Sequence, residues 1–483
     1  MIEEVHYLFL SPNDPYFLRI HATLIELLYK SNPKSVFVIF PVYGIRGNRQ
    51  ITGLIAALRD TKQSIKDLME TFRNIHTILT GYFSKDISEE IKTHLIWISP
   101  QQWITTIIHS SFSSPSNYDD LLVDTYIRFK PSPTTDRNDK FWHANQKRAN
   151  RYYNLAKWIL AKYPIKAAFG SYCSYIYHGV PHRVCLSKGI NTVSFGAIQS
   201  FFKIHHQGEL NPTHSTDHTK YNYSPKDILP PKLIEQAEAS LKARIYGQRD
   251  ISVPYMKENR CKRLGAINDK LKSERLILLH DFYDSSHVYR YNLFENHFEW
   301  TVSTIKHLIK TRQKVFIKPH PNATQASRDV IKQLKDVFSN YNEIYWIDSS
   351  IMNISLFEAS PSLVLTVYGS VGPEAAYCGI PVLYAGDHPA INFPIGSNPK
   401  SIEEYYFLLD HPKHVNIGSK DAAISFIAQH YRSLFEARKQ SLISYLGCSF
   451  DVLNKDPSIL VNANVSAFLE NSCSELIDEL SAK

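Results

Sequence analysis

A lysine and a histidine stand between prolines where an apolar stretch of this chain ends. Residues 314–317 predict a buried strand, and Lys318, Pro319, His320 and Pro321 then form the loop at its carboxyl end. Ligands bind at that edge of open α/β sheets. The prolines stiffen the loop, so that a cation and an imidazole are presented at low entropic cost. Lys318 can neutralise a phosphate or diphosphate leaving group, and His320 can donate a hydrogen bond or a proton to it. The alternative is a rigid loop whose histidine caps a helix.

A glycine-rich turn follows the strand predicted at 363–367. Its glycines allow the backbone to approach a ligand, and Pro373 suits the first turn of a helix whose free N–H groups attract phosphate. Ser370 adds a hydroxyl group, and Glu374 can accept hydrogen bonds from ribose hydroxyls. A purely structural turn would explain the glycines but not the serine and the glutamate together. The candidate ligand-binding residues of this turn are Tyr368, Gly369, Ser370, Val371, Gly372 and Glu374.

A third polar cluster follows the strand predicted at 275–279. It contains His280, Asp281, Asp284, Ser285 and His287. A carboxylate here, Asp284 or failing that Asp281, can act as base or nucleophile toward a sugar carbon, with His280 and Ser285 as substrate contacts. The histidines and aspartates are also chemically able to bind a metal, but their spacing matches no established motif, so we expect no metal site. A structural alternative is that Asp284 or Ser285 caps the next helix.

The elements around these clusters alternate between strand and helix, which is the rhythm of parallel βαβ units. Strands are predicted at 5–10, 35–40, 94–98, 167–169, 192–195, 275–279, 314–317, 344–347, 363–367 and 381–384. We therefore predict an α/β protein in which two Rossmann-like domains face each other across a cleft, with a C-terminal helical tail. The expected boundaries are 1–270 for the first domain, 271–400 for the second and 401–483 for the tail. The longest helix of the tail is predicted over 420–446.

Residues 200–230 lack this rhythm and are rich in His, Asn, Thr, Ser and Pro, which predicts an irregular segment. Histidines 205, 206, 214 and 218 superficially resemble a metal-binding tract. Because no Cys or carboxylate lies at ligand spacing, we expect them to be solvated loop residues.

The charge balance narrows the range of partners. The 483 residues include 54 Lys and Arg against 46 Asp and Glu, a formal net charge of +8. This suits phosphate-bearing ligands or an anionic membrane face and is not by itself typical of a nucleic-acid-binding protein. The six cysteines form no CxxC pair, which favours a reducing compartment. No run of about 18–20 apolar residues predicts a membrane span, and the first residues do not resemble a signal peptide. We expect a cytoplasmic protein, peripheral to the membrane at most.

Together, the motif at 318–321, the turn at 368–376 and the sequence Gly379-Ile380-Pro381-Val382 resemble GT-B glycosyltransferases of bacterial surface polysaccharide synthesis. The likeness is to capsule-type Kdo transferases and, more loosely, to bacterial sialyl- and polysialyltransferases, which use CMP-activated 2-keto sugar acids. The resemblance implies that His320 and Ser370 hold the CMP phosphate. It also implies that Asp284, in a stretch similar to the Asp-x-Ser of capsule Kdo transferases, is the nucleophile of a retaining reaction.

These observations lead to the hypothesis of a metal-independent GT-B glycosyltransferase without a cofactor. It would move a CMP-activated 2-keto sugar acid, of the Kdo or the sialic or pseudaminic (nonulosonic) type, onto a bacterial surface glycan. The glycan acceptor, bound by the first domain, would be carried on a lipid at the inner face of the cell membrane, and nucleic acid is not an expected partner. The alternatives are a UDP-sugar epimerase, a CDP-glycerol glycerophosphotransferase of the same fold, and a non-catalytic nucleotide-sugar-binding protein.

Overall fold

The structure, a computed structural model, describes residues 3–42, 54–102, 118–130, 132–195, 200–206, 209, 222–248, 250, 262, 263, 265, 268–289, 291–436, 440–448 and 450–482. The chain forms two compact units. Unit 1 comprises Met1–Lys130, Asp136–His214 and Lys439–Lys483, and unit 2 comprises Pro131–Thr135 and Ser215–Arg438. Each unit contains a predominantly parallel sheet covered by helices, so the predicted α/β class with two Rossmann-like domains is confirmed.

Unit 1 contains a six-stranded sheet with the order β3-β2-β1-β4-β5-β6, in which only the edge strand β6 runs antiparallel to its neighbour. Its strands are β1 (Val5–Pro12), β2 (Ser35–Val42), β3 (Leu95–Trp97), β4 (Ile165–Phe169), β5 (Asn191–Ser194) and β6 (Lys203–His205). Its helices before residue 214 are α1 (Pro15–Ser31), α2 (Leu54–Gly81), α3 (Ser88–Thr93), α5 (Asp119–Phe129), α6 (Lys140–Lys162) and α7 (Tyr175–Ser187). Helices α5, α6 and α7 pack on one another, and α1 packs on α2.

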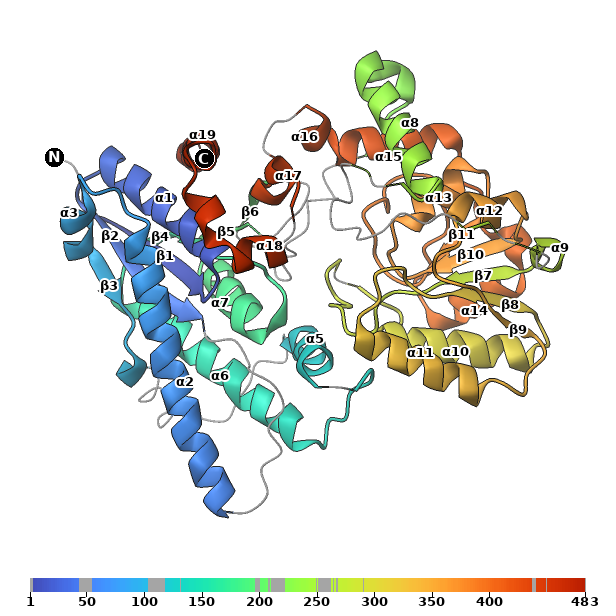
Figure 1. Cartoon of the computed structure of the whole chain (residues 1–483), viewed down its shortest axis with the longest axis horizontal. Helices are drawn as coiled ribbons and strands as arrows, with labels where there is room; N and C mark the ends of the chain where they lie inside the picture. The colour runs from blue at the N-terminus through green and yellow to red at the C-terminus, as the bar shows by residue number, and fades with distance from the viewer. Residues whose placement is uncertain are drawn as a thin grey trace. The chain divides into compact units, whose positions relative to one another are not determined.

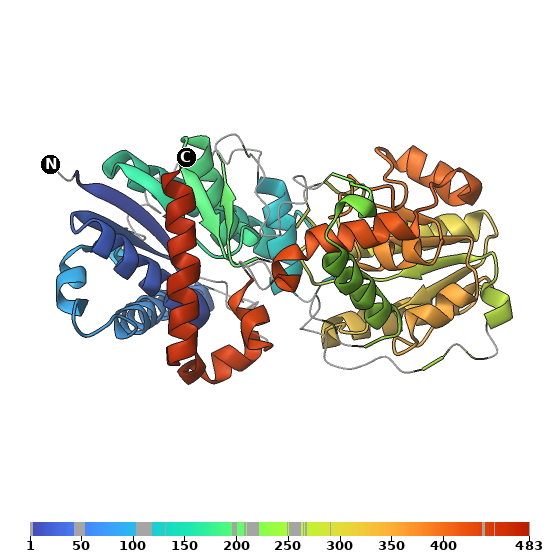
Figure 2. The same cartoon turned by 90° about the horizontal axis from the view of Figure 1, so that it is seen from above.

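The end of the chain returns to unit 1. It forms α17 (Leu442–Leu446), α18 (Phe450–Lys455), the 3-10 helix η5 (Pro457–Val461) and α19 (Ala463–Ser481). Helix α19 lies against α1, and the buried Leu469 and Leu476 join the core beside β1 (Figures 1 and 2). Arg19 of α1 strengthens this attachment, because its guanidinium donates to the carbonyl oxygen of Leu460 at 3.1 Å and to the hydroxyl of Ser466 at 2.9 Å.

Unit 2 contains a five-stranded, fully parallel sheet with the order β11-β10-β7-β8-β9. Its strands are β7 (Arg275–Leu278), β8 (Val315–Lys318), β9 (Ile344–Trp346), β10 (Leu363–Thr366) and β11 (Val382–Tyr384). Its helices are η3 (Lys226–Ile228), α8 (Pro231–Ile245), α9 (Asn268–Leu271), α10 (His297–Lys310), α11 (Gln325–Val337), α12 (Asn353–Glu358), α13 (Val371–Tyr377), α14 (Ile402–Asp410), η4 (Pro412–His414), α15 (Lys420–His430) and α16 (Arg432–Phe435). Within this unit, α10 and α11 lie on one face of the sheet, while α12, α13, α8 and α15 lie on the other (Figure 1).

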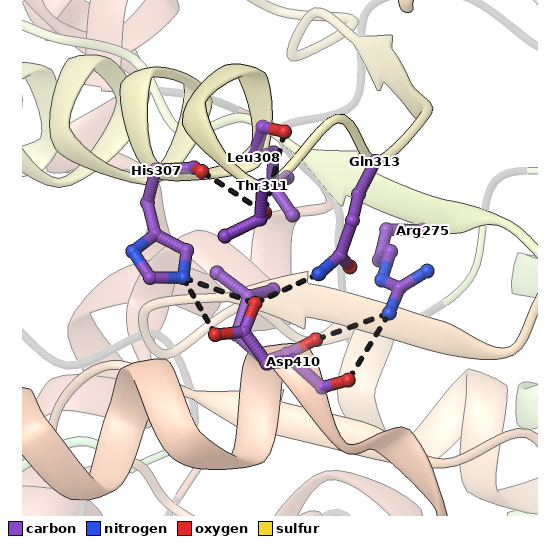
Figure 3. Close-up of polar contacts among 7 residues, drawn as sticks. Arg275, His307, Leu308, Thr311, Gln313 and Asp410 are labelled. Carbon is purple, nitrogen blue, oxygen red and sulfur yellow. Dashed lines mark hydrogen bonds and ion pairs between the residues drawn. The ribbon is translucent and has the colours of Figure 1, made fainter.

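Asp410, at the C-terminal end of α14, ties three elements of unit 2 together (Figure 3). Its carboxylate accepts a hydrogen bond from Gln313 at 2.8 Å and lies 2.9 Å from Nε2 of His307. Arg275 donates to the backbone oxygens of Leu409 and Asp410, both at 3.5 Å. These contacts hold the amino end of β7 in position. The polar cluster predicted from the sequence follows the opposite, carboxyl end of this strand.

Both expected domain boundaries and one expected helix differ from the structure, and the expected end of the second domain at 400 lies instead at 438, since unit 2 includes Ser215–Arg438. The division between the units falls at residue 214 rather than at 270, because Leu233 and Leu241 of α8 pack in one apolar core with Ile427 of α15. The single helix expected over 420–446 is three separate helices, because α15 ends at its cap residue Tyr431 and α17 belongs to the other unit.

His205 corrects a further expectation. It was predicted in a solvated loop, but it lies fully buried in β6, with its Nε2 atom 2.9 Å from the hydroxyl of Ser194 and 3.4 Å from the sulfur of Cys173. Pairing of β6 with β5 removes this histidine from water. Histidines 214 and 218 lie outside the described residues. Among the described helices, none has both the length and the apolar character that crossing a membrane requires.

Candidate functional site

The three polar clusters predicted from the sequence follow three neighbouring strands of unit 2. Strand β7 lies between β10 and β8, and all three run in the same direction. The strands end close to the same level, since Leu278 pairs with Lys318 and Ile277 pairs with Leu365. The loops that follow them therefore emerge side by side at the carboxyl edge of the sheet, where such folds bind their ligands.

His280 connects the loop after β7 to the turn after β10. Its Nε2 atom lies 3.2 Å from the backbone nitrogen of Val367, 3.4 Å from that of Tyr368 and 3.0 Å from the hydroxyl of Thr366. Backbone N–H groups can only donate, so Nε2 is the acceptor and the neutral ring carries its proton on Nδ1. The Thr366 hydroxyl accepts in turn from the N–H of Gly369 at 3.1 Å. The conformation of the glycine-rich turn is thus set by a histidine that precedes it by nearly ninety residues.

Aromatic rings hold His280 in place. It stacks on His297 with ring centres 4.5 Å apart, and Tyr368 packs against it at 4.6 Å. Burial lowers the pKa of His280 well below its ordinary value, and its neighbours His297 and His320 lower it further. The imidazole of His280 is therefore uncharged near neutral pH and acts as a hydrogen-bond acceptor within the site.

Asp281 connects the same loop to the segment after β8. Its carboxylate accepts hydrogen bonds from the N–H of Thr324 at 2.5 Å, the hydroxyl of Ser327 at 2.7 Å and the N–H of Tyr283 at 2.9 Å. Burial alone would raise the pKa of Asp281, but these hydrogen bonds, with Thr324 first, outweigh it and lower the pKa. Its oxygens serve to anchor the start of α11, which does not favour Asp281 as a nucleophile.

Asp284 and Ser285 lie further along this loop. Asp284 is exposed, and its Oδ1 atom accepts from the N–H of Ser285 at 2.9 Å. Ser285 is buried, and its carbonyl oxygen accepts a hydrogen bond from the Tyr368 hydroxyl at 2.9 Å. Neither residue caps the next helix, because Asn296 is the N-cap of α10 and accepts from the N–H of Glu299. The structural alternative considered for Asp284 and Ser285 is therefore wrong.

His320 and Ser370 differ from the buried members of the site in being at least partly exposed. The Nδ1 atom of His320 accepts from the N–H of Asn322 at 3.2 Å, so the neutral ring carries its proton on Nε2. Ser370 stands immediately before α13 as its cap residue, and its hydroxyl makes no capping bond. One side chain thus bears an N–H group and the other a hydroxyl at the same edge of the sheet.

The two glycines of the turn are required by packing within the protein. A Cβ atom on Gly369 would lie 2.5 Å from the Thr366 hydroxyl oxygen, and one on Gly372 would lie 1.8 Å from the hydroxyl oxygen of Tyr384. Because Gly372 has no side chain, the start of α13 can lie directly against β11. Val371 lies between the two glycines, as the first residue of α13.

Lys318 and Glu374 belong to a buried polar network beneath the exposed groups. The Lys318 ammonium donates to the carbonyl oxygen of Ile351 at 2.6 Å and to Oδ1 of Asn353 at 2.7 Å. The Asn353 amide then donates to Glu374 at 2.6 Å, and Glu374 also pairs with Arg244 at 3.3 Å. Lys318 is only 2% exposed and Glu374 only 3%. Both side chains support the loops from below, and neither presents its charged group at the surface as the direct ligand contact predicted from the sequence.

Several residues of this site were not found from the sequence. Thr366 was detectable as the one polar residue in an otherwise apolar strand, and His297 as a histidine at the start of an amphipathic helix. Arg244 and Asn353 carry no local signal, since each reaches the site from a distant helix. Within the described part of the chain, no group of three or more His, Cys, Asp or Glu side chains is arranged to hold a metal ion.

Comparisons with known proteins give similarities of fold. No family model matches the chain, and no curated protein matches its sequence. Among solved structures, the chain is similar to KpsC, a beta Kdo 2,4 transferase of Thermosulfurimonas dismutans, at 14% identity and a TM-score of 0.35, over 55% of this chain and 79% of that one. It is also similar to a glycosyltransferase from Rickettsia africae, at 10% identity and a TM-score of 0.28, over 95% and 100% of the two chains. A UDP-GlcNAc 2-epimerase of Methanocaldococcus jannaschii, solved with UDP-GlcNAc and UDP, matches at 11% identity and a TM-score of 0.22, over 89% and 93%.

These neighbours include both glycosyltransferases and UDP-sugar epimerases. At identities of 14% or less and TM-scores of 0.35 or less they do not assign an activity to this chain.

Proposed function

We propose that this protein is a glycosyltransferase of the GT-B type whose second unit binds the phosphate of a nucleotide-sugar donor. One observation carries the proposal: the loop after β7 bonds on one side to the glycine-rich turn through His280 and on the other side to the His320 segment through Asp281. A single loop thus joins the two segments that bear Ser370 and His320. The hydroxyl of the exposed Ser370 and the ring of the partly exposed His320 suit an anion held at the carboxyl edge of the sheet.

In the proposed reaction, the bond between the anomeric carbon and the donor phosphate oxygen breaks, and a bond from that carbon to an acceptor oxygen forms. The Nε2–H group of His320 and the Ser370 hydroxyl donate hydrogen bonds to the departing phosphate as negative charge develops on it. Donors fixed in advance by a rigid loop stabilise the transition state without the cost of reorganising solvent. The exposed carboxylate of Asp284 is the proposed nucleophile, whose oxygen bonds to the anomeric carbon as the phosphate leaves. The acceptor oxygen then displaces Asp284 from that carbon, and the proton of the acceptor hydroxyl passes to water.

The donor class follows from the motif resemblance. We propose a CMP-activated 2-keto sugar acid of the Kdo or nonulosonic type, a bacterial surface glycan as acceptor, and transfer without a metal ion or a cofactor. A UDP-sugar epimerase, a CDP-glycerol glycerophosphotransferase and a non-catalytic nucleotide-sugar binder would use the same edge of the sheet, so the test has to separate them.

A thermal-shift panel of nucleotides separates these functions. We expect CMP and CDP to raise the melting temperature, and UDP and GDP to raise it much less, because a ligand that binds only the folded state stabilises it by mass action. Transfer from a CMP-sugar to a glycan acceptor would then support the glycosyltransferase. Transfer of glycerol phosphate from CDP-glycerol, without transfer from any CMP-sugar, would support the glycerophosphotransferase instead. Selective stabilisation by UDP, together with interconversion of a UDP-sugar without any acceptor, would show that the protein is an epimerase and not a glycosyltransferase. Stabilisation by CMP without turnover of any donor would indicate a non-catalytic nucleotide-sugar-binding protein.

A further inference from the structure

Helix α6 of unit 1 has an unusual distribution of charge. Over its 23 residues it carries six basic side chains and no Asp or Glu. Its apolar face, which includes Phe141, Tyr152 and Ile159, is buried, and α6 packs against α5 and α7. The basic residues are therefore concentrated on the part of the helix that this packing leaves uncovered.

Most of these basic residues form one stripe along the helix. Lys140, Lys147, Arg151, Trp158 and Lys162 are separated by seven, four, seven and four residues. Since an α-helix turns once in 3.6 residues, positions with this spacing lie above one another. The three lysines are exposed, and the arginine and the tryptophan are partly exposed. We refer to these five residues as the α6 stripe.

Three carboxylates of α5 and the start of α6 pair with cations outside the stripe. Asp119 pairs with Arg137 at 2.7 Å, Asp120 pairs with Arg183 at 2.5 Å, and Asp139, the N-cap of α6, pairs with Lys130. Among the residues that the structure describes, the four cations of the α6 stripe form no ion pair. Like charges in a row repel one another, and this repulsion destabilises the folded protein. Binding of an anionic partner would relieve it, because the partner supplies the missing negative charges.

The aromatic side chains of the stripe indicate which anionic partner fits. The Lys162 ammonium lies 5.0 Å from the ring centre of Trp158 and 5.3 Å from that of Tyr163. A partly exposed tryptophan flanked by long lysines is typical of the interface between water and lipid, where the ring lies at headgroup level and the ammonium groups reach the phosphates. A stripe along one face of a straight helix also matches a flat partner better than a groove-forming one.

We infer that the α6 stripe binds the surface of a membrane rich in anionic phospholipids. This inference deepens the proposed function, since the glycan acceptor expected from the sequence is carried on a lipid, but the surface does not depend on any transfer reaction. Each Lys or Arg near an anionic bilayer adds to the free energy of membrane binding, and this contribution does not depend on the active site. Membrane binding and sugar transfer can therefore be tested separately.

The test is co-sedimentation of the full chain with lipid vesicles, without donor or acceptor. We expect the protein to sediment with vesicles of mixed phosphatidylcholine and phosphatidylglycerol at low salt, and to stay in solution with pure phosphatidylcholine or at high salt. Replacing Lys140, Lys147 and Lys162 together by Gln should weaken partitioning about 100-fold. The matched control replaces the exposed Lys306, Lys310 and Lys332 of unit 2 by Gln, which makes the same change in net charge and should leave partitioning nearly unchanged.

A second variant tests the aromatic part of the argument, because Trp158→Ala should also weaken binding to anionic vesicles. Equal losses in the two lysine variants would overturn the inference, since net charge alone would then explain the binding. Binding of heparin or duplex DNA that depends on the α6 stripe, without vesicle binding, would assign the surface to a soluble polyanion and overturn it as well. If vesicles bind through the stripe but no nucleotide stabilises the protein, the membrane surface stands and the proposed function fails.

Discussion

The guanidinium of Arg244 and the carboxylate of Glu374 form a buried ion pair, 3.3 Å apart, between residues that lie 130 positions apart in the chain. Their side chains are 2% and 4% exposed. Arg244 also reaches the carbonyl oxygen of Ser370 at 3.4 Å, so it contacts both the cap residue and the first turn of α13. This pair therefore fixes the position of the exposed Ser370 from below.

Removing one partner of this pair should be strongly destabilising. Arg244→Met leaves the Glu374 carboxylate buried without its cation, and we expect the free energy of unfolding to fall by about 3–5 kcal/mol. Adding Glu374→Leu should restore part of that loss, because both charges are then gone. Denaturant unfolding of the single and double variants measures the effect. If Glu374→Gln instead left stability unchanged and weakened only the binding of ribose-bearing nucleotides, the ribose contact predicted from the sequence would be correct.

His320 should be required for turnover rather than for folding. His320→Ala removes a proposed donor to the leaving phosphate, and we expect kcat to fall about 100-fold or more at an unchanged melting temperature. The control is His414→Ala, which removes an exposed histidine elsewhere in unit 2. Steady-state kinetics with the donor identified by the nucleotide panel gives the comparison. Turnover of His320→Ala close to that of the unmodified protein would rule out its assigned role.

The close packing of the glycine-rich turn gives a prediction on stability. Gly369→Ala places a methyl group 2.5 Å from the Thr366 hydroxyl oxygen, which has to move away from His280. We expect a loss of about 1–3 kcal/mol, as for other overpacked sites, together with weaker nucleotide binding. Gly81→Ala is the control, because nothing lies within 4 Å of its added Cβ atom. Similar losses in both variants would show that the turn is not tightly constrained.

Buried histidines should make the protein sensitive to mild acid. Burial lowers the pKa of His21 to about 4 from 6.5, and burial also lowers the pKa values of His182 and His280. Between the folded and unfolded pKa values the unfolded chain binds more protons, so stability is complete above about pH 6.5 and is lost as the pH falls. His21 alone should account for about 3 kcal/mol between pH 6.5 and 4. Urea unfolding over this range should show a shallower pH dependence in His21→Gln, and an identical slope would exclude the effect.

The return of the chain end to unit 1 predicts where a core substitution acts. Leu469 of α19 is fully buried against α1, and Leu469→Ala should cost about 2–5 kcal/mol. Val461→Ala alters a side chain that is 58% exposed and should change stability by less than about 0.5 kcal/mol. Hydrogen exchange resolves the two units, and the loss of protection should appear in unit 1. Loss in unit 2 instead would contradict the division of the chain.

The sequence by itself determined the local pieces of this protein. Apolar runs flanked by polar loops located every described strand except β6, because a strand buried on both faces has to be apolar along its whole length. The same reasoning placed His320, Ser370 and Asp284 in loops after strands, and the parallel rhythm put those loops at one edge of a sheet. These inferences succeeded because they depend on neighbours within a few residues. Lys318, predicted in such a loop, is instead the last residue of β8.

Only the tertiary structure decided what each polar group does. Lys318 and Glu374 share residue types with surface ligands, yet contacts with Asn353 and Arg244 turn both into internal supports. His280 gained its role as an acceptor from the N–H groups of a turn far along the chain, and the end of the chain crossed back to α1. The burial and the hydrogen-bond partners of a residue depend on segments that are distant in sequence. The residue type and its local spacing therefore do not predict them.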